Sequence, residues 1–237
     1  MECLVVDIGP SAYREAWDLQ RAVWNARVEG SVPDVLILTE HRHVYTLGKG
    51  ADESHLLATK EELRQKGVEV FEIDRGGDVT YHGPGQIVGY PIVDLNDHYR
   101  DVHRYLRDLE EVVIRTLLSL GVEGSRIEGL TGVWVDGCKI AAIGVKVSRW
   151  VTMHGFALNV NTDLSYFNGI VPCGIFHKGV TSLQQVLARD VDMEQVKAEL
   201  SKRFGEVFGL TMKSVTGAEF NVHSEAKKEL EWHQQGR

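Results

Sequence analysis

Residues 133–147 of the 237-residue chain read VWVDGCKIAAIGVKV, and this stretch does most to decide the fold class. Two apolar runs flank the pair Asp136-Gly137, which is a preferred sequence for a two-residue hairpin turn. Residues 152–160 continue as a further apolar run with strand character. The pattern therefore predicts a group of strands in the middle of the chain.

Helices and further strands are expected on both sides of this group. Apolar runs at 4–8, 35–38 and 68–73 predict strands. Ser11 is the expected cap of a first helix, and Thr59 with Glu62 forms a capping-box pattern for a short second helix. Residues 99–120 show the longest helical spacing, and Asp192 opens a late helix. This order is not a regular parallel βαβ series, so the sequence predicts a single α+β domain.

Composition excludes several classes of protein. The chain has 26 Lys+Arg against 34 Asp+Glu, a formal net charge of −8, which disfavours nucleic-acid binding through bulk charge. Three cysteines are too few for a disulfide framework. The chain contains no run of about 18 apolar residues, which a membrane-spanning helix would need. The start Met1-Glu2-Cys3 lacks the basic and apolar regions of an export signal, so we expect a cytoplasmic protein.

The first segment that predicts chemistry is RGGDVTYHGPGQIVGYP, residues 75–91. Glycine is costly inside a plain strand, so its density here indicates tight turns or backbone that approaches a ligand. An ordinary glycine-rich hairpin is the alternative. No Gly-Lys-Ser/Thr follows, so the segment is not a phosphate-binding P-loop. The glycines concerned are Gly76, Gly77, Gly83 and Gly85.

The second segment is DGCKIAAIGVKVSRW, residues 136–150. Strand alternation places Lys139 on the same face as Ala141, Ile143, Val145 and Val147. Lys139 is then either an edge lysine whose stem lies along apolar surface, or a partly dehydrated amine that acts as a base.

The third segment is GIVPCGI, residues 169–175, in which Cys173 lies between proline and glycine. A cysteine in such a turn can present its sulfur to a cleft, whereas Cys3 and Cys138 fit structural roles in strands. Candidate bases for a nucleophilic Cys173 are His82, His154, His177 and Lys139. The sequence around Cys173 lacks the papain signature.

A zinc site is not supported, because no Cys-x-x-Cys or His-x-x-x-His spacing occurs. His41 and His43 are two residues apart and would share one face of a strand, but surface positions explain them better.

Four strings in this order, RGGDVTYHGPGQIVGYP, KIAAIGVKVSR, MHGFALNV and VPCGI, resemble the lipoyl(octanoyl) transferases. The resemblance extends over roughly residues 36–183. It implies the fold of biotin and lipoate protein ligases, an α+β domain with a mixed central sheet flanked by helices. It also implies that Cys173 carries an acyl thioester and that Lys139 favours its thiolate. The implied substrate-binding residues are Arg75, Gly76, Gly77, Asp78, Val79, Thr80, Tyr81, His82, Ala142, Ile143, Gly144, Gly155, Phe156 and Ala157.

The reaction implied by this resemblance is transfer of an octanoyl group from octanoyl-acyl carrier protein to a lysine of a lipoyl domain. The implied acceptors are the E2 subunits of 2-oxoacid dehydrogenases and the glycine cleavage H protein. A thioester is already activated, so no ATP, cofactor or metal is expected, and neither nucleic acid nor membrane is an expected partner. The alternatives are an ATP-dependent lipoate or biotin protein ligase, a non-catalytic module that binds carrier domains, and a cysteine hydrolase.

Two further expectations concern the rest of the chain. We expect residues 1–217 to form the acyltransferase domain and residues 218–237 a polar tail. An acidic carrier protein would need a local basic surface on this acidic chain, for which Arg75, Lys146, Arg149 and Lys178 are candidates. Small residues are expected to leave a narrow slot for the alkyl chain, namely Gly76, Gly77, Ala142, Gly144, Gly155 and Ala157.

Overall fold

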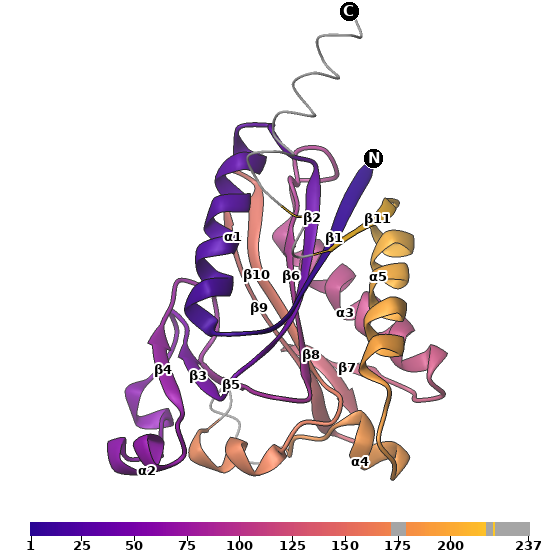
Figure 1. Cartoon of the computed structure of the whole chain (residues 1–237). Coiled ribbons are helices and arrows are strands. Elements are labelled where there is room, and N and C mark those ends of the chain that lie inside the picture. Colours follow the sequence, from indigo (N-terminus) through magenta and orange to yellow (C-terminus); the bar gives the residue numbers. More distant parts are fainter. Residues whose placement is uncertain (172–178, 217–219, 221–237) are drawn as a thin grey trace, which may run out of the picture.

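The computed structural model describes residues 1–171, 179–216 and 220, and shows one large sheet with helices on both faces (Figure 1). The eight strands of this sheet lie in the order β11-β1-β2-β6-β10-β9-β8-β7. β1 pairs in parallel with β2 and β11, and the other pairs are antiparallel. The strands are β1 Glu2–Ser11, β2 Asp34–His41, β6 Gln86–Ile92, β7 Ser125–Ile127, β8 Leu130–Val135, β9 Cys138–Ser148, β10 Val151–Asn159 and β11 Thr211–Thr216.

A smaller sheet of three strands has the order β4-β3-β5, with β3 Val44–Leu47, β4 Glu69–Glu72 and β5 Val79–His82. The main helices are α1 Tyr13–Val28, α3 Val102–Ser119 and α5 Met193–Phe208. Shorter ones are α2 Lys60–Gln65, α4 Leu183–Leu187, η1 Glu53–His55 and η2 Leu164–Gly169. The α+β class with a mixed central sheet flanked by helices is confirmed.

The two faces of the large sheet bury different helices. Side chains of α3 and α5 such as Leu109 and Phe204 pack with Ile87 and Leu158 in the larger apolar core. On the other face, Ala16 and Val23 of α1 pack against β1, β2 and β6. The small sheet lies beyond the N-terminal end of α1, at the lower left of Figure 1. A helix or sheet with one apolar face is stable only when that face is covered, which explains the layered arrangement.

Helix starts follow side-chain capping except at α1. Asp192 accepts the amide of Glu194 at 2.9 Å, and Thr59 with Glu62 forms the expected capping box. The prediction for Ser11 was wrong, because this residue ends β1 and its hydroxyl lies 2.8 Å from that of Thr39. Ala12 is the N-cap of α1, and its amide donates to the carboxylate of Glu15 at 3.3 Å.

The glycine-rich segment is not a hairpin. Its first half is β5 of the small sheet and its second half is β6 of the large sheet, so residues 83–85 carry the chain from one sheet to the other. Gly85 has φ +77°, and a Cβ there would lie 2.5 Å from the carbonyl oxygen of Asn161. Glycine is therefore required at this crossing by both conformation and space.

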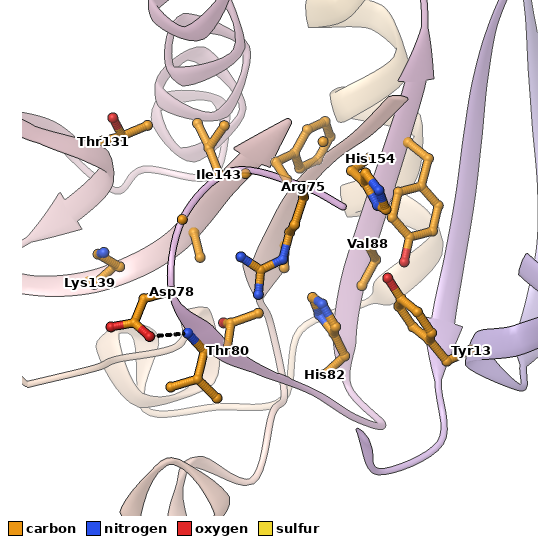
Figure 2. Close-up of a pocket in the computed structure, with 18 residues that line it drawn as sticks. Tyr13, Arg75, Asp78, Thr80, His82, Val88, Thr131, Lys139, Ile143 and His154 are labelled. Carbon is orange, nitrogen blue, oxygen red and sulfur yellow. Dashed lines mark hydrogen bonds between the residues drawn. The ribbon is translucent and has the colours of Figure 1, made fainter. Parts of the chain in front are cut away.

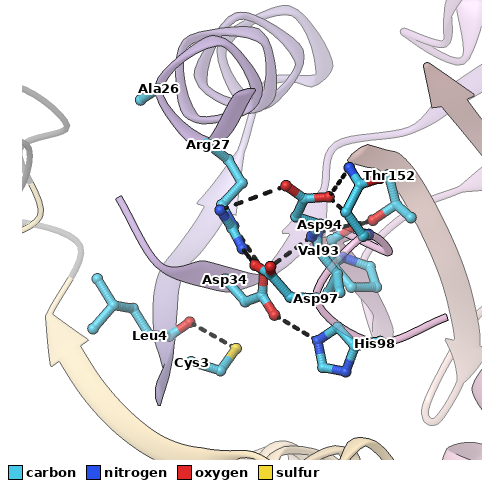
Figure 3. A network of polar contacts seen from close by, with 12 residues as sticks. Cys3, Leu4, Ala26, Arg27, Asp34, Val93, Asp94, Asp97, His98 and Thr152 are labelled. Carbon is cyan, nitrogen blue, oxygen red and sulfur yellow. Dashed lines mark hydrogen bonds and ion pairs between the residues drawn. The ribbon is translucent and has the colours of Figure 1, made fainter. Parts of the chain in front are cut away.

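A polar network that is buried at Asp34 and His98 and reaches the surface at Asp97 ties α1 to the large sheet (Figure 3). Arg27 of α1 donates to Asp34 of β2 at 2.9 Å and to Asp97 at 2.5 Å, and His98 lies 2.9 Å from Asp34. Burial, with the Asp34 charge as a second cause, raises the pKa of the nearby Cys3 thiol. Cys3 is therefore an unreactive structural thiol, as expected.

Within the residues that the structure describes, no helix is long and apolar enough to cross a membrane. The same part of the chain contains no group of three His, Cys, Asp or Glu side chains arranged to hold a metal ion.

Candidate active site

A cavity lies against the face of the large sheet that α1 covers, between β6, β9 and β10 on one side and residues 75–82 on the other (Figure 2). All of the predicted substrate-binding residues line it except Gly76 and Tyr81, and Lys139 lies at its edge. Segments that are far apart in the chain therefore meet here. The full lining is Tyr13, Arg75, Gly77, Asp78, Val79, Thr80, His82, Val88, Tyr90, Thr131, Lys139, Ala142, Ile143, Gly144, His154, Gly155, Phe156 and Ala157.

Lys139 reaches the cavity because β9 contains a bulge. Val133 of β8 pairs with Ala141, but the next residue, Trp134, pairs with Lys139, so β9 has one residue more than β8 at this point. Ile140 and Ala141 both pack into the apolar core. Lys139 therefore lies on the opposite face from Ala141, and the expectation that they share a face was wrong. A bulge reverses the alternation of a strand at one residue, and the sequence pattern does not reveal it.

Lys139 is held by one contact of its side chain and two hydrogen bonds of its backbone. Its Nζ lies 5.1 Å from the centre of the Trp134 ring, an arrangement that stabilises a cation. Its amide donates to the carbonyl of Gly179 at 2.9 Å, and its carbonyl accepts from Thr181 at 2.9 Å. Gly179 follows the sequence VPCGI by only a few residues. Cys173 itself lies outside the described residues, as does the candidate base His177.

The turn at residues 75–78 forms one wall of the cavity. The amide of Gly76 donates to Val145 of β9 at 2.9 Å, and Gly77 has φ +89°. The Arg75 guanidinium donates to the carbonyl and hydroxyl oxygens of Thr46 at 2.8 and 3.0 Å. Asp78 is paired with His55 at 2.5 Å and accepts the amide of Val79. This wall is therefore held by the small sheet and by β9 together.

Two of the three candidate basic docking residues that the structure describes, Arg75 and Lys146, do not offer a free positive charge. Arg75 is only 7% exposed, so its prediction as a surface docking residue was wrong. Lys146 is paired with Asp74 at 2.6 Å. Arg149 is exposed at the turn after β9, and Lys178 lies outside the described residues.

The two predicted residues that do not line the cavity have other contacts. Gly76 contributes its backbone to the contact with β9. Tyr81 is buried in the small-sheet cluster, and its hydroxyl lies 2.7 Å from Nδ1 of His43. His43 is thus part of an aromatic stack with Tyr81 and Tyr166. We expected both His41 and His43 to lie on the surface. His41 is buried, so that prediction was wrong for His41.

The end of the cavity away from Lys139 is polar. His82 is 2.8 Å from the Gln86 side chain, His154 is 2.8 Å from Asp74, and the Tyr90 hydroxyl is 2.6 Å from His41. Burial, and then the neighbouring His41, lowers the pKa of His82 to about 3. Burial also lowers the pKa of His154, although Asp74 opposes the shift. Both rings are therefore neutral at pH 7, and such weak bases are poorly suited to take a proton from an amine.

Sequence patterns missed four lining residues, namely Tyr13, Val88, Tyr90 and Thr131. Tyr13 opens α1 and Val88 lies in an apolar strand, so each looked like an ordinary core residue. Only the packing of α1 on β6 brings these positions to the cavity. Val88 and Tyr90 lie inside the quoted segment 75–91, but nothing there distinguishes them from core residues, and no local signal points to Tyr13 or Thr131.

The glycines of the cavity are required mainly by the chain itself. A Cβ at Gly155 would lie 2.2 Å from the carbonyl oxygen of Gly89 in β6. A Cβ at Gly144 would lie 2.9 Å from that of Gly76. The expectation that these glycines simply leave room for an alkyl chain therefore needs correction, because much of that room is filled by neighbouring backbone.

The sequence matches one protein-family model and is similar to octanoyltransferases from other organisms. The model of the lipoyl protein ligase A/B catalytic domain matches residues 12–205. An octanoyltransferase of Rubrobacter xylanophilus is 57% identical, with 85% of this chain and 91% of that protein covered. An octanoyltransferase of Cytophaga hutchinsonii is 47% identical, with 90% and 95% covered.

Solved structures show the same fold at low sequence identity. A bipartite lipoate protein ligase of Thermoplasma acidophilum has a TM-score of 0.71 at 17% identity, with 98% of this chain and 92% of that chain covered. A lipoate-protein ligase A bound with ATP has a TM-score of 0.71 at 16% identity, with 98% and 95% covered. Because the family model matches most of its length and the two octanoyltransferases are 47% and 57% identical to it, the chain belongs to the lipoyl protein ligase A/B catalytic domain family and, within it, to the octanoyltransferase enzymes.

Proposed function

We propose that this chain transfers an octanoyl group from octanoyl-acyl carrier protein to a lysine of a lipoyl domain, through an acyl thioester on Cys173. The proposed acceptors are lipoyl domains of 2-oxoacid dehydrogenase E2 subunits and the glycine cleavage H protein, and the proposed location is the cytoplasm. The observation that carries the proposal is the position of Lys139, which the β9 bulge turns toward the cavity and whose backbone pairs with Gly179 and Thr181 beyond the VPCGI segment.

In the first half-reaction, the Cys173 thiolate attacks the carbonyl carbon of the donor thioester. The carbon–sulfur bond to the carrier breaks, and the carrier thiolate takes a proton from the Lys139 ammonium. A free cysteine has a pKa of about 8.5 and is only a few per cent thiolate at neutral pH, so a neighbouring cation increases the nucleophile available. Thiol exchange between two thioesters is close to balanced, so no ATP is needed.

In the second half-reaction, the neutral acceptor amine attacks the Cys173 thioester. Lys139, now uncharged, takes the proton that this nitrogen loses as the amide forms, and Cys173 leaves as a thiolate. The ion pair is thereby restored for the next cycle. Burial of about seven methylene and methyl groups along the cavity would contribute on the order of 5 kcal/mol to substrate binding. This lining includes Val79, Val88, Ile143 and Phe156.

A transfer assay tests the proposed activity. The full chain is incubated with a lipoyl domain and octanoyl-carrier protein without ATP, or with free octanoate, magnesium and ATP. We expect octanoylated lipoyl domain only from the thioester donor. Product made only with ATP would support the ligase alternative, release of free octanoate alone would support a hydrolase, and no turnover would support a binding module.

Variants of the two proposed catalytic residues locate the chemistry. Lys139→Ala should lower kcat/KM by about 10³-fold, which is the size expected for loss of general acid–base catalysis. Lys213→Ala, at an exposed lysine of β11, is the matched control and should remain within twofold. A loss below tenfold for Lys139→Ala would make Lys139 a positional residue only.

A further inference from the structure

The cavity extends along β9 and β10. Ala142 pairs with Ala157, Gly144 with Gly155 and Val145 with His154, so the lining residues follow one another in register along these two strands. Lys139 lies at one side of the cavity, and Tyr13 and His154 lie at the opposite side (Figure 2). Under the proposed function, the thioester carbon lies at the Lys139 end, and the alkyl chain extends toward Tyr13 and His154.

The length of this path matches an eight-carbon chain. The three steps along β9 from Ala142 to Val145 advance by about 10 Å at the usual rise of a strand. Seven carbon–carbon bonds of about 1.5 Å, laid out as a zigzag, extend by about 9 Å. If the acyl carbonyl lies beside Ala142, three positions along β9 from Lys139, the octanoyl chain ends at the level of His154.

The residues at that level are polar and buried. Tyr13, His82, Tyr90 and His154 are 2%, 7%, 3% and 1% exposed. Tyr90 and His154 use one polar atom each on His41 and Asp74. No hydrogen bond joins the Tyr13 hydroxyl to any residue that the structure describes, although this hydroxyl belongs to a side chain that lines the cavity. The Tyr13 and His82 rings lie parallel, with centroids 6.2 Å apart.

We propose that Tyr13 and Tyr90, with the His82 and His154 rings beside them, form a polar end to the acyl cavity that limits the transferred chain to about eight carbons. This inference rests on the proposed function and adds the determinant of chain length to it. A longer chain would press methylene groups against these polar atoms and exclude water from the Tyr13 hydroxyl, which has no hydrogen bond to a described residue to replace it, and this is unfavourable in a buried site. A shorter chain would leave apolar lining uncovered.

Chain-length profiles of hydroxyl-deletion variants test this inference. Wild type, Tyr13→Phe, Tyr90→Phe and the double variant are assayed with hexanoyl-, octanoyl-, decanoyl- and dodecanoyl-carrier protein. We expect wild type to prefer octanoyl over decanoyl by at least tenfold in kcat/KM. Tyr13→Phe should reduce that preference by about tenfold, since a misplaced methylene in a binding pocket changes kcat/KM by roughly this factor.

Tyr13→Phe is the cleanest variant, because its hydroxyl has no hydrogen bond to a described residue and the ring is kept. Tyr90→Phe is the second variant and removes the partner of His41. Tyr105→Phe is the control, since it deletes a fully buried hydroxyl on α3, on the other face of the sheet, and should leave the profile unchanged.

The outcomes separate the two proposals. Absence of octanoyl transfer by wild type would overturn the proposed function. Octanoyl transfer that persists in all variants with an unchanged decanoyl-to-octanoyl ratio would overturn the polar end alone. A ratio that rises equally in Tyr105→Phe would also overturn it, because the effect would then not be specific to the cavity.

Discussion

His41 and His82 illustrate how a side chain can be polar, buried and uncharged at the same time. Their ring centroids lie 5.7 Å apart, and burial is the first cause that lowers the pKa of His41 to about 4 and that of His82 to about 3. The unfolded chain binds a proton at each of these histidines below about pH 6.5, whereas the folded chain does not. Their contribution to stability is thus complete above about pH 6.5 and is lost progressively as the pH falls toward the folded values.

The substitution His41→Gln tests this linkage. Glutamine keeps a hydrogen-bonding group near the Tyr90 hydroxyl and has no charge to gain. Between pH 7.5 and 5.0 the unfolding free energy of wild type should fall by about 2 kcal/mol more than that of the variant. Urea denaturation at the two pH values measures this difference. His103→Gln, at an exposed position of α3, should keep the wild-type difference, and equal differences for wild type and His41→Gln would show that His41 titrates normally.

Single residues were predicted from the sequence only where a motif identified them. The resemblance pointed to Lys139 and to most of the cavity lining, but strand alternation placed Lys139 on the wrong face. The reason is the extra residue at Ile140, since both Ile140 and Ala141 are accommodated in the core. Tyr13 could not be predicted at all, because its role arises from packing between segments and not from its neighbours in the chain.

Among the elements, α3 and β8 are joined by one fully buried carboxylate. Glu110 accepts hydrogen bonds from the amide of Gly132 at 3.0 Å, from Arg107 at 2.7 Å and from Arg126 at 2.9 Å. Gly132 has φ +132°, and a Cβ there would lie 3.5 Å from Cε of Lys139. Glu110 thereby holds the start of β8 beside the proposed catalytic lysine.

We expect Glu110→Ala to lower the unfolding free energy by about 3 kcal/mol, because it leaves a buried amide and two guanidinium groups without their shared acceptor. Glu111→Ala is the neighbouring control. Glu111 also pairs with Arg126, but its side chain is 31% exposed, so its loss should cost less than about 1 kcal/mol. Chemical denaturation of both variants measures the difference. Equal effects would mean that the buried link contributes no more than a surface ion pair.

Elements with local signals were predicted well from the sequence. The capping box at Thr59 and the cap at Asp192 both lie where expected. The glycine-rich segment was harder, because nothing in its sequence shows that β5 and β6 belong to different sheets. That division depends on pairing with β3, β2 and β10, which are distant in the chain.

On the scale of the whole molecule, the net charge of −8 bears on how an acidic carrier protein approaches. Arg75 is buried and Lys146 is paired with Asp74, so neither offers a free charge. Arg149 is exposed, but Ser148 beside it lies nine positions along β9 from Lys139, a distance of about 30 Å at the usual rise of a strand. Lys49 is exposed and its amide donates to Arg75 at 2.9 Å, at the wall of the cavity.

Charge reversal distinguishes these two positions. Lys49→Glu should raise the KM for octanoyl-carrier protein about fivefold at low salt, because a like charge near the cavity slows encounter with an acidic partner. Arg149→Glu should change that KM by less than twofold. Steady-state kinetics at two ionic strengths provide the measurement, and a larger effect at Arg149 would place carrier docking at the far end of β9.

Acyl transfer through Cys173 leaves a covalent adduct whose mass rapid-quench intact-mass spectrometry measures. Full-length enzyme is mixed with octanoyl-carrier protein without ATP, quenched at successive times and then chased with a lipoyl domain; Cys138→Ser serves as the control for the wrong thiol. We expect one octanoyl adduct per chain, mapped to Cys173 and transferred to the lipoyl domain during the chase. Octanoylated lipoyl domain formed at the wild-type rate by Cys173→Ser, with no adduct at any time, would contradict it.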